Sequence, residues 1–338
     1  MTLPDVNSPV SIFHWLPRKY RPEVYQGKKD PAKYFEGWYF KFVDVSGQQI
    51  WSVIPGISYS NDSHSFVQVI NANSGRSFYI RYPLAAFQYS RRSLMVRVGP
   101  NCFKHDGAML ELETDDLILK GALQFEGTHP FPVTLASPGI MGWYGYVPFM
   151  ECYHGVVSMQ HRISGTLDIN GSAVSFDQGK GYIEKDWGAS MPSDWIWIQS
   201  NHFKGDPGAS FMISLARIPW LRGYFPGFLG FLLAKGKLYR FATYNRSVVE
   251  RLGVNDKEVL VTVKNRKFKL EIRAFLKEGV VLKAPRHGVM ERDIRESMVS
   301  RIQVELFNRN GELIFSDLGE YAGVEIVGHM EQYFRNNV

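Results

Sequence analysis

Cysteine is scarce in this sequence, which has only Cys102 and Cys152 among 338 residues. Two cysteines cannot build the disulfide framework of a small secreted domain, and a reducing compartment suits them. Long apolar runs are missing as well, because the longest one, residues 220–234, is interrupted by Arg222 and Pro226. A spanning helix needs about 20 consecutive apolar residues. The sequence therefore excludes a disulfide-rich scaffold and a helical membrane protein.

Targeting and cofactor motifs are also missing. The first 20 residues show no charged leader, no apolar core and no Ala-x-Ala cleavage site, so we expect a cytoplasmic protein. No glycine loop suits a phosphate, no Gly-x-Ser-x-Gly elbow is present, and the nine histidines form no His-Glu-x-x-His pattern. His154 and His161 are seven residues apart and flank a predicted strand. We expect no metal and no other cofactor.

The charge is moderately basic, with a formal net charge of +6. Lysine and arginine are spread along the chain and no nucleic-acid-binding motif accompanies them, so we expect no nucleic-acid partner. Two segments are candidates for peripheral contact with a membrane. One is the apolar stretch 220–234 and the other is the basic hairpin "VKNRKFKLEIR" at residues 263–273. A loop leading into a buried strand and a solvated strand face are the alternatives. The oligomeric state is not determined by the sequence.

Strand signals dominate what is present. Aromatic residues make up 14% of the chain, and short aromatic and β-branched runs alternate with turn residues such as Asn170-Gly171. Helical periodicity is modest and limited to residues 293–301 and 328–337. The pattern predicts an all-β protein of antiparallel sandwiches or barrels with few short helices. Gly, Ser and Pro cluster at residues 188–194, which predicts an N-terminal domain of residues 1–190 and a C-terminal domain of residues 191–338.

Charged and indole side chains are crowded together in "YIEKDWGASMPSDWIWIQSNHF", residues 182–203. If the first part is a strand, Glu184 and Asp186 share one face and Lys185 lies on the other. In the second part, the same alternation puts one set of side chains on a single face: Trp195, Trp197, Gln199, Asn201 and Phe203. Apolar bulk with a few polar groups is typical of a small-molecule cavity. Ordinary aromatic core packing is the alternative.

Two further acids lie in aromatic company. Glu36 occurs in "KYFEGWYFKF", where it would share a face with Trp38, and Glu151 lies three residues before His154 in "FMECYHG". A carboxylic acid surrounded by apolar rings has a raised pKa and can donate a proton near neutral pH. A salt bridge or a turn-capping role is the structural alternative for each acid.

These segments resemble the tocopherol cyclase family. The resemblance rests on "YFEGWYFK", on "YIEKDWGASMPSDWIWIQSNHF", on "GTLDINGSAVSFDQGKGYIEKDWG", on "LKAPRHGVMERDIRESM" and on "AGVEIVG". The chain is more similar to the bacterial members than to the plant enzymes, which have Asn where this sequence has Asp186. The resemblance implies a tandem pair of lipocalin-like (calycin) antiparallel β-barrels, similar to the carotenoid hydratase relatives.

The resemblance also implies an activity, the proton-initiated cyclisation of a prenylated hydroquinone, or a related isoprenoid lipid, to a chromanol. We expect one of three acids to be the proton donor, with Asp186 and Lys185 tuning it: Glu36, Glu151 or Glu184. We expect the hydrophobic ligand to contact Trp38, Tyr39, His154, Trp187, Trp195, Trp197, Gln199 and Asn201. Aromatic faces stabilise a carbocation by roughly 0.5 to 2 kcal/mol each. A non-enzymatic carrier of an isoprenoid ligand and an alkene hydratase are the alternatives.

Overall fold

The computed structural model describes residues 17–28 and 32–334, and the chain divides into two compact units. The first unit comprises Met1–Met191 and Lys283–Arg292, and the second comprises Pro192–Leu282 and Asp293–Val338. The sequence did not predict that the short segment Lys283–Arg292 belongs to the first unit. Of the first 20 residues, which were considered above for a targeting segment, residues 1–16 lie outside the described residues.

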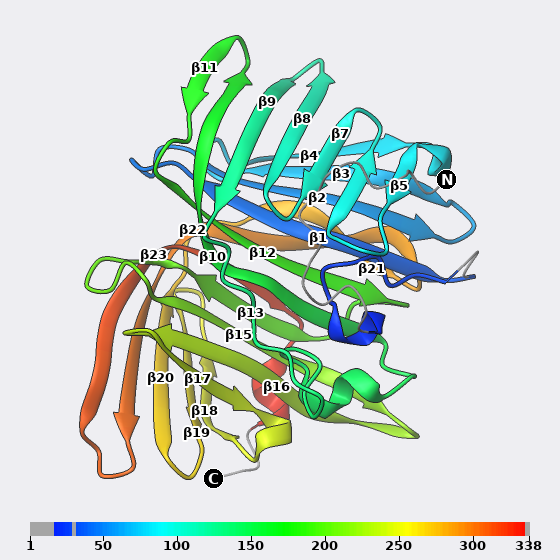
Figure 1. Ribbon diagram of the computed structural model, residues 1–338. Coiled ribbons are helices and arrows are strands. Elements are labelled where there is room, and N and C mark those ends of the chain that lie inside the picture. The colour runs from blue at the N-terminus through cyan, green and yellow to red at the C-terminus, as the bar shows by residue number, and fades with distance from the viewer. Residues whose placement is uncertain (1–16, 29–31, 335–338) are drawn as a thin grey trace. The chain divides into compact units, whose positions relative to one another are not determined.

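The first unit is built on one twelve-stranded antiparallel sheet (Figure 1). Its strands follow the order β4 (Arg76–Tyr82), β3 (His64–Asn71), β2 (Ile50–Tyr59), β1 (Tyr34–Val43), β12 (Gly179–Gly188), β10 (Cys152–Ile169), β9 (Leu117–Glu126), β8 (Gly107–Thr114), β7 (Asn101–Lys104), β6 (Met95–Val98) and β5 (Phe87–Tyr89), with β11 (Ser172–Ser175) paired to β10. Strands β1, β12 and β10 are adjacent in the interior of this order, so each strand that carries the site described below is paired on both sides.

The second unit is built on an eleven-stranded antiparallel sheet. Its order is β17 (Lys237–Ala242), β16 (Gly223–Ala234), β15 (Ser210–Trp220), β13 (Trp195–Ser200), β23 (Leu313–Val327), β22 (Val289–Asn308), β20 (Phe268–Phe275), β19 (Glu258–Lys264) and β18 (Val248–Val254), with β14 (His202–Phe203) paired to β23 and β21 (Val280–Arg286) paired to β22. The predicted all-β antiparallel class is therefore confirmed. The prediction of closed barrels is wrong. Among the described residues, no pairing joins the first strand of either sheet to its last strand, so both sheets are open.

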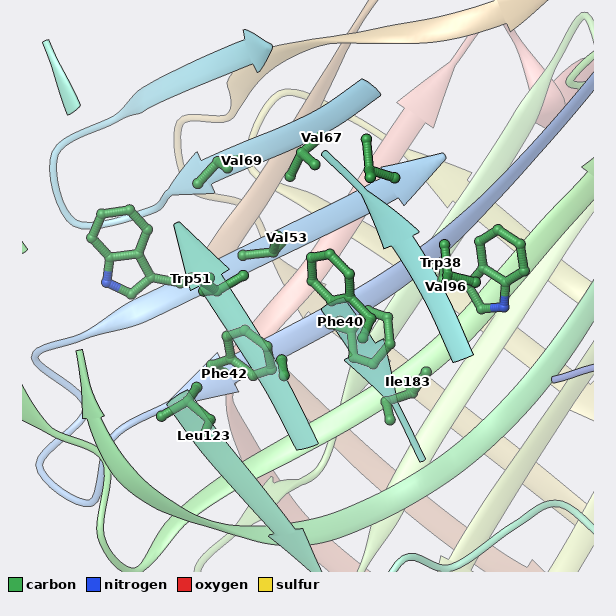
Figure 2. Packing of buried hydrophobic residues seen from close by; sticks show 14 of the residues in the cluster. Trp38, Phe40, Phe42, Trp51, Val53, Val67, Val69, Val96, Leu123 and Ile183 are labelled. Atoms are coloured by element: carbon green, nitrogen blue, oxygen red, sulfur yellow. The ribbon is translucent and has the colours of Figure 1, made fainter. Parts of the chain in front are cut away.

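The core of the first unit lies on one face of its sheet. Strand β1 alternates, so that Trp38, Phe40 and Phe42 enter this core and are fully buried. Figure 2 shows Phe40 and Phe42 pointing into the same interior as Val53 of β2. The rings of Phe40 and Phe42 are 6.4 Å apart between centroids. Successive side chains of a strand point to opposite faces, so the residues of β1 between these three lie on the other face of the sheet.

Helices are few and short in the described residues. They are the 3-10 turns η1 (Arg18–Tyr20), η2 (Leu84–Ala86), η3 (Gly142–Tyr146), η4 (Thr243–Asn245) and η5 (Met330–Tyr333). The helix predicted at residues 293–301 is wrong, because this segment lies within strand β22 and its paired neighbours decide its conformation. Within the part of the chain that the structure describes, no helix has the length and apolar character needed to cross a bilayer.

Candidate acid cluster and its surroundings

Strand β12 sends its charged side chains to two different faces, as the sequence predicted. Lys185 lies on the face of the apolar core, where it is fully buried, and its Nζ is 2.5 Å from Oε1 of Glu36 on β1. Glu36 is also fully buried. A buried ion pair is stable only when further hydrogen bonds satisfy the remaining polar atoms.

Glu36 has such hydrogen bonds. Its carboxylate accepts the backbone N–H of Gln26 at 2.8 Å and that of Gly27 at 3.0 Å, and it also accepts the hydroxyl of Tyr34. Lys185 donates to the carbonyls of Pro22, at 2.9 Å, and Val24, at 2.5 Å. The pair therefore fixes residues 22–27 against the sheet.

Two indole rings enclose the ammonium group. The Nζ of Lys185 lies 4.5 Å from the ring centroid of Trp38 and 4.9 Å from that of Trp187. Trp187 stacks on Tyr153 with 5.6 Å between the ring centroids. Burial lowers the pKa of Lys185, and the neighbouring Glu36 carboxylate opposes that shift. This arrangement explains the crowding of charge and indole as a structural network on the core face.

The opposite face of β12 carries a second cluster. The Nδ1 of His154, on β10, lies 2.9 Å from Oδ1 of Asp186, and its Nε2 lies 3.6 Å from Oε2 of Glu184. His154 and Asp186 are direct partners in the β10–β12 ladder. Antiparallel partners present their side chains to the same face, so the backbone register itself brings the three groups together.

The proton balance of this cluster depends on the imidazole. Burial of His154 disfavours its charge, but the carboxylates of Asp186 and Glu184 overcome that effect and raise its pKa to about 9. At neutral pH the ring is therefore an imidazolium that is hydrogen-bonded to Asp186 and lies 3.6 Å from Glu184, beyond hydrogen-bond distance. Burial, reinforced by Glu184, raises the pKa of Tyr182 well above its usual range, so its hydroxyl stays protonated and donates to Glu184 at 2.7 Å.

Polar residues are buried over much of this face of the first sheet. Lys41 and Ser52 are ladder partners, as are Phe35 and Ser58, so the β1–β2 register puts these side chains on the face of Glu184. The buried polar and phenolic residues of this face include Tyr39, Lys41, Ser52, Ser58, His64, Gln68, Tyr182 and Glu184. Such groups are stable in the interior only when they have partners.

The remaining predicted residues of the first unit are near the cluster but outside it. Tyr39 lies opposite Glu184 in the β1–β12 ladder and shares its face. Trp38 and Trp187 lie with Lys185 on the core side. Glu151 directly precedes β10 and is partly exposed, and its carbonyl accepts the N–H of Ala189 at 2.8 Å.

The other predicted binding residues belong to the second unit. Ile196 and Ile198 of β13 enter its apolar core, so Trp195 and Trp197 lie on the opposite face. The indole of Trp195 donates to Oε2 of Glu325 at 2.6 Å. Gln199 and Asn201 are also fully buried.

The placement of Phe203 on the Trp face is wrong. Strand β13 ends at Ser200 and pairing resumes only at β14, so the alternation restarts and Phe203 enters the core with Ile198. The extended pattern in the sequence did not reveal this interruption at Asn201.

Sequence reasoning missed three residues beside the predicted ones, of which Tyr182 and Glu296 are buried and Glu325 is partly exposed. Tyr182 is a partner of Glu184, Glu325 is a partner of Trp195, and Glu296 of β22 is fully buried and paired in register with Glu325. Period-two alternation in "GYIEKDWG" was a signal for Tyr182. Glu296 was hidden because its segment was predicted to be a helix.

The three side chains of this cluster could bind a metal ion, or they could transfer a proton. Ligand atoms of His154, Glu184 and Asp186 all lie within 4.8 Å of one another, a spacing that can hold a cation. One imidazole with two carboxylates is a set that several divalent metals accept. The same three groups also hold one proton between a base and two acids, which is what general acid catalysis requires.

Two antiparallel sheets, the first of which carries this partly buried acid cluster, define a two-unit all-β protein. The chain belongs to the tocopherol cyclase-like family, whose model matches residues 129–328, more than half of the chain. The chloroplastic tocopherol cyclase of Zea mays is 25% identical over 201 residues, a match that covers 55% of this chain and 41% of the maize protein. The chain thus matches less than half the length of its curated plant relatives.

Solved structures are similar in fold. The crystal structure of CghA with Sch210972 gives a TM-score of 0.56 at 11% identity, covering 88% of this chain and 90% of that one. Kievitone hydratase from Nectria haematococca gives a TM-score of 0.50 at 10% identity, covering 92% of this chain and 95% of that one. These likenesses extend over nearly the whole chain and describe its fold.

Proposed function

We propose that this protein catalyses the proton-initiated cyclisation of a prenylated hydroquinone or a related isoprenoid lipid to a chromanol-type ring. The observation that carries the proposal is the cluster of His154, Glu184 and Asp186, in which Glu184 is buried and the other two side chains are partly buried, and which stores a proton on the polar face of the first sheet. Membership of the tocopherol cyclase-like family supports the same chemistry.

Glu184 is the proposed proton donor among the three acids predicted from the sequence. Glu36 is held by a buried ammonium and several hydrogen-bond donors, which tie it to the residue 22–27 segment. Glu184 instead faces an imidazolium across 3.6 Å. Glu151 is partly exposed and lies before the strand that carries His154.

The proton reaches Glu184 when the substrate displaces water. An apolar tail beside the cluster lowers the local polarity, and a low-polarity environment disfavours separated charges relative to neutral groups. The Nε2 proton of His154 then moves to Glu184, while the Nδ1 proton stays on Asp186's side of the ring. The resulting carboxylic acid is poised to protonate an alkene.

The reaction needs no external reagent. The Glu184 proton forms a new C–H bond at the less substituted alkene carbon, which leaves a tertiary carbocation on the other carbon. The phenol oxygen of the same molecule forms the C–O bond, and its proton returns to the Glu184 carboxylate. The product is an isomer of the substrate. Holding the flexible tail near the phenol contributes on the order of several kcal/mol through orientation.

Turnover in D₂O tests the proposal. Purified protein is incubated with a phytyl- or geranylgeranyl-hydroquinone, and product mass and bound lipid are followed together. We expect a chromanol with one carbon-bound deuterium, and a rate that falls at least about 100-fold in Glu184→Gln, since general acid catalysis contributes on this scale. Glu126→Gln, an exposed acid on β9, is the matched control and keeps full activity.

The outcomes separate the alternatives. A product heavier by one water molecule indicates an alkene hydratase, in which water captures the same cation; the side chain of Asp186, 25% exposed, offers water access to the cluster. Unchanged lipid that copurifies with the protein indicates a carrier. Full turnover by Glu184→Gln contradicts the assigned donor, and loss of turnover after EDTA dialysis, restored by a divalent metal, indicates metal catalysis instead.

A further inference from the structure

A long loop joins β9 to β10 (Figure 1), and several of its aromatic side chains are exposed. Residues 130–150, "PFPVTLASPGIMGWYGYVPFM", contain no charged residue and no histidine. In the described part of the first unit, the exposed large aromatic side chains all lie in this segment. Their exposed fractions are 46% for Trp143, 37% for Tyr146 and 56% for Phe149. Leu135 of the same segment is 77% exposed. We call residues 130–150 the aromatic loop.

The aromatic loop is held in place by buried anchors. Phe131, Ile140, Met141 and Met150 are all less than 10% exposed. The hydroxyl of Tyr153, on β10, donates to the carbonyl of Val147 at 2.5 Å. The exposed rings therefore project from a fixed framework. Irregular loops of this length in compact domains usually serve a function.

A basic residue, Lys19, borders the loop. The Nζ of Lys19 lies 4.7 Å from the ring centroid of Tyr146, and the hydroxyl of Tyr146 donates to that of Tyr20 at 3.0 Å. Arg18, which precedes Lys19 in the same 3-10 turn, instead donates to the carbonyls of Gln26 and Gly27. No acidic residue occurs between residues 127 and 150. The surface thus combines apolar rings with positive charge at its border.

We propose that the aromatic loop docks on the surface of a lipid bilayer containing anionic lipids. Trp and Tyr have an apolar body and a polar edge, and they favour the boundary between headgroups and acyl chains. Lysine near that boundary is attracted to anionic headgroups. The absence of charge inside the loop removes the desolvation cost that an embedded charge would carry.

Docking also has a consequence for the acid cluster, and this step rests on the proposed function. The backbone N–H of His154 contacts the sulfur of Met141, a buried residue of the loop, at 3.2 Å. A bilayer against the loop would therefore lie next to the segment that positions His154. A substrate with an isoprenoid tail resides in the bilayer, so docking would bring enzyme and substrate together.

Vesicle binding by the full chain tests the docking without any turnover. Flotation with phosphatidylcholine vesicles, with and without phosphatidylglycerol, measures partitioning, and brominated lipids report insertion by quenching tryptophan fluorescence. The double variant Trp143→Ser/Phe149→Ser should partition roughly 30-fold more weakly, because the two half-exposed rings together contribute about 2 kcal/mol on burial. Lys19→Gln should weaken binding roughly fivefold on the anionic vesicles alone.

The matched control is Val45→Ser, which removes another exposed apolar side chain of the first unit, 74% exposed in the turn after β1. It should bind vesicles as the unchanged chain does. Failure of the unchanged chain to bind either vesicle, or equal binding by the double variant and the control, overturns the proposal. Self-association that the double variant abolishes, without vesicle binding, identifies a protein contact and also overturns it. Lost turnover with normal vesicle binding affects the proposed function alone.

Discussion

At the scale of single residues, Glu36 and Glu184 show how neighbours separate two similar acids. Both are buried carboxylates on adjacent strands. Glu36 has a cation 2.5 Å away and backbone donors around it, which gives it a structural role. Glu184 faces a histidine and a tyrosine, which gives it access to a movable proton.

The Glu36–Lys185 pair should behave as a coupled unit in stability measurements. Glu36→Gln leaves a buried ammonium without its counter-ion and should lower the free energy of unfolding by about 3 to 5 kcal/mol. Adding Lys185→Met removes that uncompensated charge, so the double variant should be more stable than Glu36→Gln alone. Urea unfolding measures both effects. Glu126→Gln, which breaks the exposed pair with Arg162, should change stability by less than about 1 kcal/mol.

His154 should make stability depend on pH. Its pKa is raised to about 9 in the folded chain, against an ordinary value of 6.5, so protonation favours the folded state. This contribution is fully present below pH 6.5 and is lost as the pH rises through 9, on the order of 3 kcal/mol in total. Urea unfolding between pH 6 and 10, compared with His154→Gln, checks it. A parallel decline in both proteins would contradict the assignment to His154.

At the scale of elements, the β10–β12 ladder determines what the site contains. The ladder pairs His154 with Asp186 in regular register, and irregularities follow between Val156 and His161. These irregularities bring the ring of His161 over Gly181 of β12, where an added Cβ would lie 2.1 Å from Nε2 of His161. Glycine at this position therefore permits the close approach of the two strands.

Gly181→Ala tests that close approach. The added methyl group should lower the free energy of unfolding by about 1 to 3 kcal/mol through overpacking, and His161→Ala in the same chain should restore part of the loss. Gly253→Ala on β18 is the matched control, because its Cβ would meet only Leu260 at 3.9 Å. Equal effects of the two alanine substitutions would show that strand propensity, and not the His161 contact, causes the loss.

At the scale of the whole molecule, the chain returns to its first unit late in the sequence. Lys283–Arg292 belongs to that unit, where Gln68 and Lys283 exchange two hydrogen bonds of 2.8 and 3.2 Å. Ser58 donates to the carbonyl of Gly288 at 2.5 Å. No single boundary in the sequence therefore separates the two units. The boundary predicted between residues 190 and 191 stays a prediction.

A fragment of residues 1–191 should be much less stable than the first unit in the full chain. It lacks the partners of Gln68 and Ser58, and a buried polar group without a partner costs about 1 to 3 kcal/mol. We expect weak near-ultraviolet circular dichroism and broad thermal unfolding for the fragment, and a sharp transition for the full chain. A cooperative transition of the fragment at the same temperature would contradict this.

The sequence by itself determined the all-β class, the family and the faces of β12, because period-two alternation and the Glu-Lys-Asp-Trp-Gly motif are local properties. Only the tertiary structure decided which acid pairs with Lys185, because the local sequence pattern does not determine which residues of two distant strands lie opposite each other. It also decided that residues 293–301 form a strand, since pairing with β23 overrides a modest helical periodicity. That register places Glu36 beside Lys185, where it has a structural role, and Glu184 beside His154, where it belongs to the proton cluster.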